Sequence, residues 1–173
     1  MRSIKWIAAL GLLLITCAAV AQEKSPYIGH WKLNVAKSDY SQAPNMKPKS
    51  ASLSIMADSK ASMRWHAAVT DAEGKQQTYN FAGAKDGKAH PVTGDNPWKE
   101  AAYTEGADNA LTADVTLKDG SKLKQEITVS GDTITAKNSG AENSTEVWER
   151  VKGAMAGGSM GKGKGSGKAA PPQ

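Results

Sequence analysis

The chain is poor in cysteine. Its 173 residues contain one, Cys17, which lies inside an apolar stretch near the N-terminus. The remainder of the chain can therefore form no disulfide bond. About 130 residues must be held together by burial of apolar side chains alone, which is feasible for a domain of that size.

A hydrophobic run long enough to span a bilayer is not evident at the N-terminus. The apolar run from Ile7 to Cys17 is short, Arg2 and Lys5 precede it, and Ala19-Val20-Ala21 follows it. A basic start, a short apolar run and a small-x-small step are typical of a secretory signal peptide. The sequence predicts a signal peptide over residues 1–21, cleaved after Ala21, and hence a periplasmic or secreted protein.

A second interpretation of this region is a lipoprotein. Leu14-Ile15-Thr16-Cys17 is similar to a bacterial lipobox, which would place a lipid on Cys17. The residue before the lipidated cysteine is normally Gly, Ala or Ser, and here it is Thr16. Cleavage after Ala21 is therefore the favoured prediction.

The central part of the chain also lacks an excess of charge. The sequence has 22 Lys and Arg against 17 Asp and Glu, but five of the bases lie in the first 21 and last 21 residues, which contain no acid. Residues 22–152 thus carry 17 charges of each sign. This balance argues against a nucleic-acid-binding protein, which would carry a basic face on the domain itself.

The last 21 residues differ in composition from the rest. Residues 153–173 consist of Gly, Lys, Ser, Ala, Met, Pro and Gln without apolar periodicity. Such a segment buries too little apolar surface to offset the entropy of ordering, so we predict a disordered tail. Its lysines, Lys162, Lys164 and Lys168, would at most make weak contact with anionic envelope surfaces, at about 1 kcal/mol each.

No amphipathic helix is evident, whereas alternation of apolar and polar residues is frequent. Trp31, Leu33 and Val35 alternate with Lys32 and Asn34, a period of two that predicts a half-buried strand. Nine or ten such strands follow one another between turn sequences. The pattern predicts an all-β fold over residues 22–152, a single antiparallel up-and-down β-barrel of about 8–10 strands, because closure removes exposed strand edges.

The first predicted strand carries a recognisable motif. Gly29-His30-Trp31 resembles the Gly-x-Trp step of the lipocalin and calycin barrels, in which an arginine of the last strand packs across the tryptophan. Its extension Lys32-Leu33-Asn34-Val35-x-Lys37-Ser38, together with Asp86-Gly87-Lys88 and Pro91-Val92-Thr93-Gly94, is similar to small exported lipocalin-like bacterial proteins. The resemblance covers residues 27–151. It implies a barrel fold and an envelope location, but no substrate and no catalytic residues.

The resemblance also implies a structural pair at one end of the barrel. Arg150, in the last predicted strand, is placed to pack over the ring of Trp31. An arginine over an indole gains about 0.5–2 kcal/mol by cation–π attraction. We interpret this pair as structural and not as a binding site.

Several aromatic residues are candidates for the wall of a ligand cavity. They are Trp65, Tyr79, Phe81 and Tyr103, with Trp98 nearby in the sequence. The simpler alternative is that they fill a solid core, since small barrels occur both packed and hollow. Alanines at expected inward positions, Ala51, Ala67, Ala113 and Ala136, leave room for a cavity, but the sequence does not decide between the two.

Patterns typical of metal sites or catalysis are missing. His30, His66 and His90 have no ligand spacing, so no metal and no cofactor are predicted. Residues 22–152 contain neither a Gly-x-Ser-x-Gly motif nor a cysteine nucleophile. Glu146 and Glu149 fall on opposite strand faces and are interpreted as solvated, so no catalytic residue is predicted.

These observations lead to two hypotheses of function. The first is an exported, non-enzymatic, lipocalin-like protein that binds a small hydrophobic ligand inside the barrel. The alternative is a structural or interaction module of the cell envelope with a solid barrel core.

Overall fold

The computed structural model describes residues 25–153. The predicted signal peptide, its cleavage site, Cys17 and all of the predicted tail beyond Gly153 lie outside the described residues. The described part contains two short 3₁₀ helices, η1 (Pro44–Met46) and η2 (Ala107–Asn109). Its strands are β1 (Gly29–Leu33), β2 (Ser50–Asp58), β3 (Met63–Thr70), β4 (Gln76–Gly83), β5 (His90–Thr93), β6 (Trp98–Glu105), β7 (Leu111–Leu117), β8 (Lys122–Ser130), β9 (Thr133–Gly140) and β10 (Ser144–Arg150).

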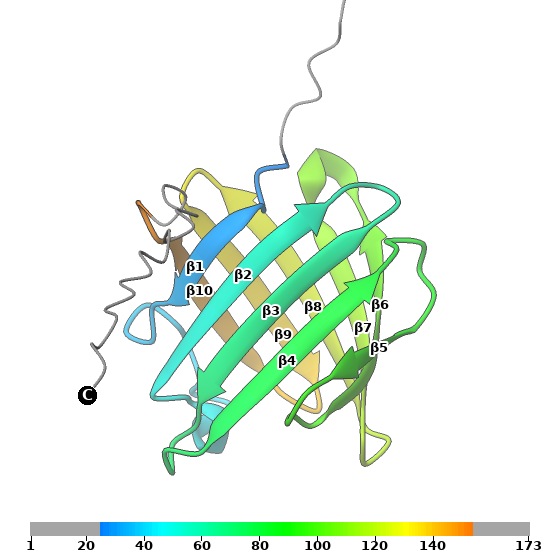
Figure 1. Ribbon diagram of the computed structural model, residues 1–173. Helices are drawn as coiled ribbons and strands as arrows, with labels where there is room; N and C mark the ends of the chain where they lie inside the picture. The colour runs from blue at the N-terminus through cyan, green and yellow to red at the C-terminus, as the bar shows by residue number, and fades with distance from the viewer. Residues whose placement is uncertain (1–24, 154–173) are drawn as a thin grey trace, which may run out of the picture.

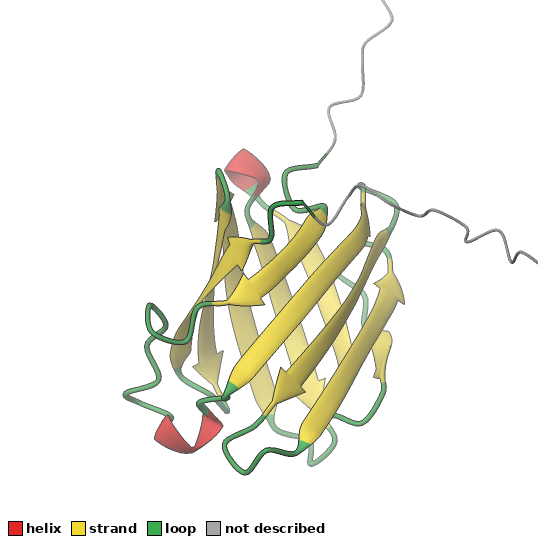
Figure 2. Cartoon of the chain, turned by 60° about the vertical axis from the view of Figure 1, so that its left-hand side comes forward, coloured by secondary structure: helices red, strands yellow, loops and turns green. Residues whose placement is uncertain are grey.

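The strands form one closed antiparallel barrel, which confirms the predicted fold (Figures 1 and 2). Each strand pairs with the next one along the chain, and β1 closes the ring by pairing with both β2 and β10. In this register Trp31 lies opposite Leu53 on one side and Arg150 on the other. Closure satisfies the backbone groups that an open sheet would leave at its edges.

The burial of successive residues follows the alternation that predicted the strands. In β1 the residues Gly29, Trp31 and Leu33 are buried, while His30 and Lys32 are not. Inward side chains of the other strands complete an apolar interior. β5 has only four residues. It contains Pro91, which has no amide hydrogen to donate to a neighbouring strand.

The end of the barrel where β1 begins is closed by Trp31 and Arg150. Trp31 is 1% exposed, and its indole Nε1 donates a hydrogen bond to the carbonyl oxygen of Tyr27 at 2.9 Å. The guanidinium carbon of Arg150 lies 4.0 Å from the centre of the Trp31 ring. Arg150 also donates to the carbonyl oxygens of Ile28 (2.9 Å) and Pro26 (2.6 Å), so it ties the entering chain to the last strand.

Glycine is required at the first position of the Gly-x-Trp motif. Gly29 has a φ of +150°, and a Cβ at this position would lie 2.6 Å from Nη1 of Arg150. A larger residue would displace the guanidinium from the tryptophan ring. The motif therefore has a local physical cause: the glycine leaves the space that the arginine occupies.

A buried ion pair lies at the same end of the barrel. Nζ of Lys85, in the loop between β4 and β5, lies 2.7 Å from Oδ1 of Asp58, and their side chains are 4% and 3% exposed. Glu105 approaches the same ammonium at 3.4 Å. The Lys85–Asp58 contact is an ion pair and not a well-directed hydrogen bond. The pair joins the end of β2 to the loop after β4.

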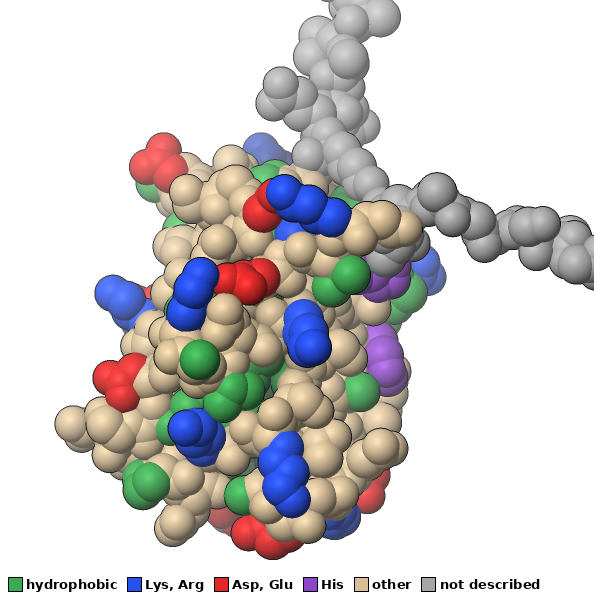
Figure 3. Space-filling view, turned by 90° about the vertical axis from the view of Figure 1, so that its left-hand side faces the viewer, with side chains coloured by type: hydrophobic (Ala, Val, Ile, Leu, Met, Phe, Trp, Pro, Cys, Tyr) green, Lys and Arg blue, Asp and Glu red, His purple; other side chains and the backbone are tan. Residues whose placement is uncertain are grey.

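The opposite end of the barrel carries the long β1–β2 connection with η1 (Figure 1). Met46 of η1 is 51% exposed. No helix among residues 25–153 has the length and apolar character needed to cross a membrane. On the face shown in Figure 3, lysine and arginine side chains are interspersed with acidic ones, and hydrophobic side chains are visible at the bottom of a hollow.

Candidate functional site

The interior of the barrel contains a cavity of about 380 Å³. This volume lies within the range of small-molecule sites, roughly 300–1,000 Å³. Apolar and aromatic side chains make most of its wall, and residues of the β1–β2 connection, among them Asn45, Met46 and Pro48, contribute at the η1 end. Trp31 and Arg150 do not line the cavity, which agrees with their structural role at the closed end.

Three of the four aromatic residues predicted for the cavity wall are found there. Trp65, Tyr79 and Tyr103 line the cavity, together with Trp98 and Trp148. Trp98 stands edge-on to both Trp65 (6.1 Å between ring centres) and Tyr79 (5.5 Å). Such edge-to-face contacts fix the orientation of the rings, so this part of the wall is formed before any ligand enters.

Phe81, the fourth predicted residue, does not line the cavity. It is 2% exposed and packs behind the wall, stacked on Trp65 at 5.8 Å and edge-on to Tyr103 at 4.9 Å. Alternation correctly placed Phe81 on the inner face of its strand. Alternation does not say which inward side chains meet the hollow and which are covered by neighbours, and that is why this prediction was wrong.

Three of the four alanines expected to leave room for a cavity lie in its wall. Ala51, Ala67 and Ala136 line the hollow, whereas Ala113 is fully buried elsewhere in the core. A larger side chain at the three lining positions would project into the cavity. Small side chains facing inward from β2, β3 and β9 are therefore one cause of the free volume.

A chain of polar groups crosses one wall of the cavity, from β8 to the β9–β10 connection. Gln125 Nε2 donates to Asn138 Oδ1 (2.9 Å), and Asn138 Nδ2 donates to Ser144 Oγ (2.9 Å). Ser144 Oγ in turn donates to Glu142 Oε1 (3.0 Å). Gln125, Asn138 and Ser144 are each less than 9% exposed. The hydrogen bonds run in one direction and end on a carboxylate.

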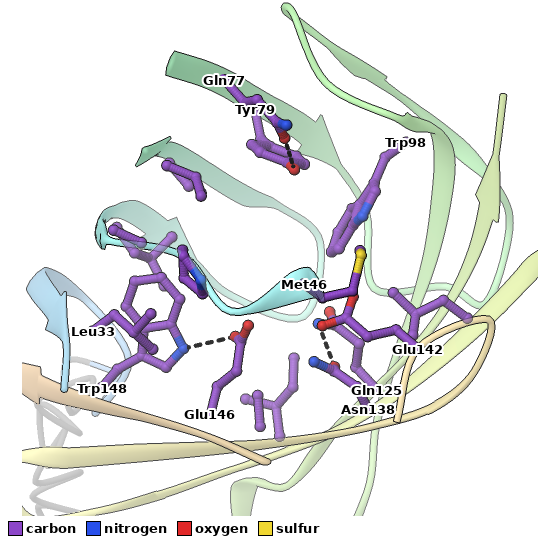
Figure 4. Close-up of a pocket in the computed structure, with 18 of the residues that line it drawn as sticks. Leu33, Met46, Gln77, Tyr79, Trp98, Gln125, Asn138, Glu142, Glu146 and Trp148 are labelled. Atoms are coloured by element: carbon purple, nitrogen blue, oxygen red, sulfur yellow. Dashed lines mark hydrogen bonds between the residues drawn. The ribbon is translucent and has the colours of Figure 1, made fainter. Parts of the chain in front are cut away.

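A second carboxylate, that of Glu146, projects into the cavity from β10 (Figure 4). Trp148 Nε1 donates to its Oε2 at 3.1 Å, and the Tyr40 hydroxyl donates to its Oε1 at 3.2 Å. Burial, and next the nearby charge of Glu142, raise the pKa of Glu146 to about 7. Burial also raises the pKa of Glu142. The two carboxyl groups therefore titrate at higher pH than ordinary glutamates.

The prediction that Glu146 is solvated like Glu149 was wrong, because its side chain lines the cavity. Glu149 of the same strand does face outward and pairs with Lys37 at 2.8 Å. Glu146 lies two residues before Trp148, and this period of two could have placed it inside. Gln125, Asn138 and Ser144 also occupy inward positions, but polar residues at such positions give no hydropathy pattern.

The three histidines lie apart from one another and outside the cavity wall. His30 is hydrogen-bonded to Ser54 (2.8 Å), His66 to Asn80 (2.8 Å) and His90 to Asp86 (3.2 Å). Within residues 25–153, no three His, Cys, Asp or Glu side chains come together as metal ligands would.

Comparison with solved structures finds several β-barrels of similar fold. Secretory abundant heat soluble protein 4 from Ramazzottius varieornatus is similar with a TM-score of 0.53 and 13% identity, over 74% of this chain and 96% of that one. The Schistosoma mansoni fatty acid binding protein in complex with arachidonic acid has a TM-score of 0.50 and 14% identity, over 73% of this chain and 97% of that one. Echinococcus granulosus fatty-acid-binding protein 1 has a TM-score of 0.50 and 13% identity, over 74% of this chain and 99% of that one. At these identities the likeness shows a shared fold. Neither a family model nor a curated protein sequence matches the chain.

The raised pKa of Glu146 predicts a stability that falls with rising pH. Because the folded state holds the proton up to about pH 7 and the unfolded chain only to about 4.5, the free energy of unfolding should decrease across that interval. The expected loss is about 3 kcal/mol, complete above pH 7. Urea denaturation between pH 4 and 8 measures it.

Two variants on opposite faces of β10 serve as the test and the control for this measurement. Glu146→Gln should remove most of the decrease between pH 4.5 and 7, because the amide does not titrate and only the contribution of Glu142 remains. Glu149→Gln, on the outer face of β10, should retain it. Equal pH profiles for the native protein and Glu146→Gln would show that this carboxyl group ionises as it does in water.

Proposed function

We propose that the protein is a non-enzymatic binding protein that holds one small hydrophobic molecule inside its barrel. The observation that carries the proposal is the cavity of about 380 Å³, walled by Trp65, Tyr79, Trp98, Tyr103 and Trp148 with a few polar groups on one side. A mostly apolar hollow with few polar groups is the usual form of a small-molecule site.

Two further observations support this proposal over a structural module with a solid core. The first is that the interior is not filled: three inward alanines leave free volume. The second is that a solved barrel of similar fold is described in complex with arachidonic acid. Among the described residues that line the cavity there is no histidine and no cysteine, so the Ser–His and Cys–His pairs of nucleophilic catalysis are not found there.

We further propose that the protein acts outside the cytoplasm, in the periplasm or after secretion. This rests on the sequence of residues 1–21, with its basic start, apolar run and Ala-x-Ala step. N-terminal sequencing of the protein from its own cell envelope would test it, since Gln22 should be the first residue. An N-terminus at Cys17 would instead indicate a lipoprotein, and an intact Met1 would contradict export.

Binding to the cavity can be tested with the neutral hydrophobic dye Nile red. We expect its fluorescence to rise and shift to the blue on addition of the protein, with one dye bound per chain. Ala67→Phe should weaken binding by at least about tenfold, because the new ring occupies the hollow. Ala68→Phe is the matched control: it is the next residue of β3 and lies on the outer face, so binding should not change.

The same experiment can contradict the proposal in two ways. Equal binding of the dye by Ala67→Phe and the native protein would place the site outside the barrel. No binding at all would show that the cavity is not accessible. Native mass spectrometry of the protein purified gently from its own source would then identify a retained ligand by its mass.

A further inference from the structure

The charges that line the cavity are all of one sign. Its wall includes Glu142 and Glu146 inside, and Asp71 and Glu73 in the turn between β3 and β4. Among the described residues that line it there is no lysine, arginine or histidine. An acidic ligand would therefore bring its charge beside like charges, with no cation on the wall to compensate.

The polar wall also presents hydrogen-bond acceptors to the cavity. The hydrogen bonds run from Gln125 to Asn138 (Figure 4), then through Ser144 to Glu142. Glu146 accepts one hydrogen bond at each oxygen, and a carboxylate oxygen can accept two. A bound molecule can therefore donate to the free lone pairs of the Glu146 carboxylate, and a charged donor would bind there most strongly.

Aromatic rings complete the environment of the two carboxylates. Trp148 is hydrogen-bonded to Glu146, and the nearby charges of Glu142 and Glu146 contribute, after burial, to raising the pKa of the Tyr79 hydroxyl. Tyr79 in turn contacts Trp98 edge-on. Carboxylates set among aromatic faces are the arrangement that proteins use to hold organic ammonium groups, through ion pairing and cation–π attraction.

We propose that the ligand is a cationic amphiphile: an apolar body in the aromatic part of the cavity with a protonated amine held by Glu142 and Glu146. This inference rests on the proposed function, since it names the ligand class for the same cavity. The volume of about 380 Å³ lies at the lower end of the range of small-molecule sites, roughly 300–1,000 Å³, which suits an amphiphile with a single chain. A fatty acid with a chain of the same length as the amine would fit the cavity, but its carboxylate would lie beside the acidic side chains of the wall.

The proposal makes binding depend on pH. The ammonium should bind more tightly when Glu146 and Glu142 are ionised, so affinity should rise between pH 6 and 8. The titratable groups that face Glu146 are Glu142 from the β9–β10 connection, Tyr40 from the β1–β2 connection and Tyr79 from β4. Tyr40 and Tyr79 stay neutral in this interval because burial raises the pKa of both hydroxyl groups.

The experiment compares three molecules that share one chain and differ in the head group: dodecylamine, dodecanol and dodecanoate. Each is titrated into the full-length mature protein loaded with Nile red at pH 8, and displacement gives its affinity. We expect dodecylamine to bind at least about tenfold more tightly than dodecanoate, with dodecanol between them. Lowering the pH to 6 should weaken dodecylamine while leaving dodecanol unchanged.

The variants separate charge from packing. Glu142→Gln/Glu146→Gln should remove the preference for dodecylamine over dodecanol and the pH dependence of that preference. Glu149→Gln, on the outer face of β10 beside Lys37, is the matched control and should behave as the native protein does.

The outcomes distinguish a wrong ligand class from a wrong binding function. If dodecanoate binds as tightly as dodecylamine, or if the double variant keeps the preference, the ligand class is wrong while the binding function stands. If none of the three displaces Nile red and native mass spectrometry shows no adduct, the proposed function fails and this inference fails with it.

Discussion

Replacing Trp31 by alanine should lower the free energy of unfolding by about 3–5 kcal/mol. The side chain is 1% exposed, donates a hydrogen bond to Tyr27 and supports the guanidinium of Arg150, so its removal leaves a cavity at the closed end of the barrel. Urea or thermal denaturation of the mature chain, followed by circular dichroism, gives the loss directly.

Phenylalanine at the same position separates packing from hydrogen bonding. Trp31→Phe keeps an aromatic ring beneath Arg150 but leaves the carbonyl oxygen of Tyr27 without its 2.9 Å partner. We expect a smaller loss, about 1–2 kcal/mol. An unchanged midpoint for Trp31→Ala would show that the closed end does not depend on the Gly-x-Trp motif.

Replacing Lys85 by methionine should have an effect of similar size, about 3–5 kcal/mol. The substitution preserves most of the side-chain volume but leaves the carboxylate of Asp58, 3% exposed, without its cation at 2.7 Å. Of its described partners, the carboxylate would retain a hydrogen bond from Ser25. Equilibrium denaturation at pH 7 measures the loss.

Two controls make this prediction specific to burial. Lys88→Met removes a lysine of the same loop that is 82% exposed and lies 3.9 Å from Asp86, so the loss should be below about 0.5 kcal/mol. Asp58→Leu/Lys85→Met removes both charges and should recover most of the stability lost in Lys85→Met. A double variant as unstable as Lys85→Met would show that packing and not the unpaired charge causes the loss.

Of these two expected losses, only the one at Trp31 could be assigned to its cause from the sequence. Trp31 and Arg150 could be paired in advance only because the resemblance to lipocalin barrels brings the first and last strands together. Lys85 and Asp58 belong to no such motif, and in the sequence each is one of the 34 charged residues between positions 22 and 152.

The sequence by itself determined the fold. Period-two alternation identifies strands, turn residues place the hairpins, and closure is the simplest way to satisfy the edges of an antiparallel meander. These are local rules, so they can be read from neighbouring residues, and they placed Trp65, Tyr79 and Tyr103 correctly on the inside of the barrel.

Only the tertiary structure decided which inward side chains meet a hollow and which polar ones are buried. Phe81 and Tyr79 both face inward from β4, yet Phe81 is covered while Tyr79 lines the cavity. Alternation with Trp148 could place Glu146 on the inner face of β10, but its contact with Tyr40, more than 100 positions away, forms only in the folded barrel. Free volume and burial depend on contacts between distant strands, and therefore no local pattern records them.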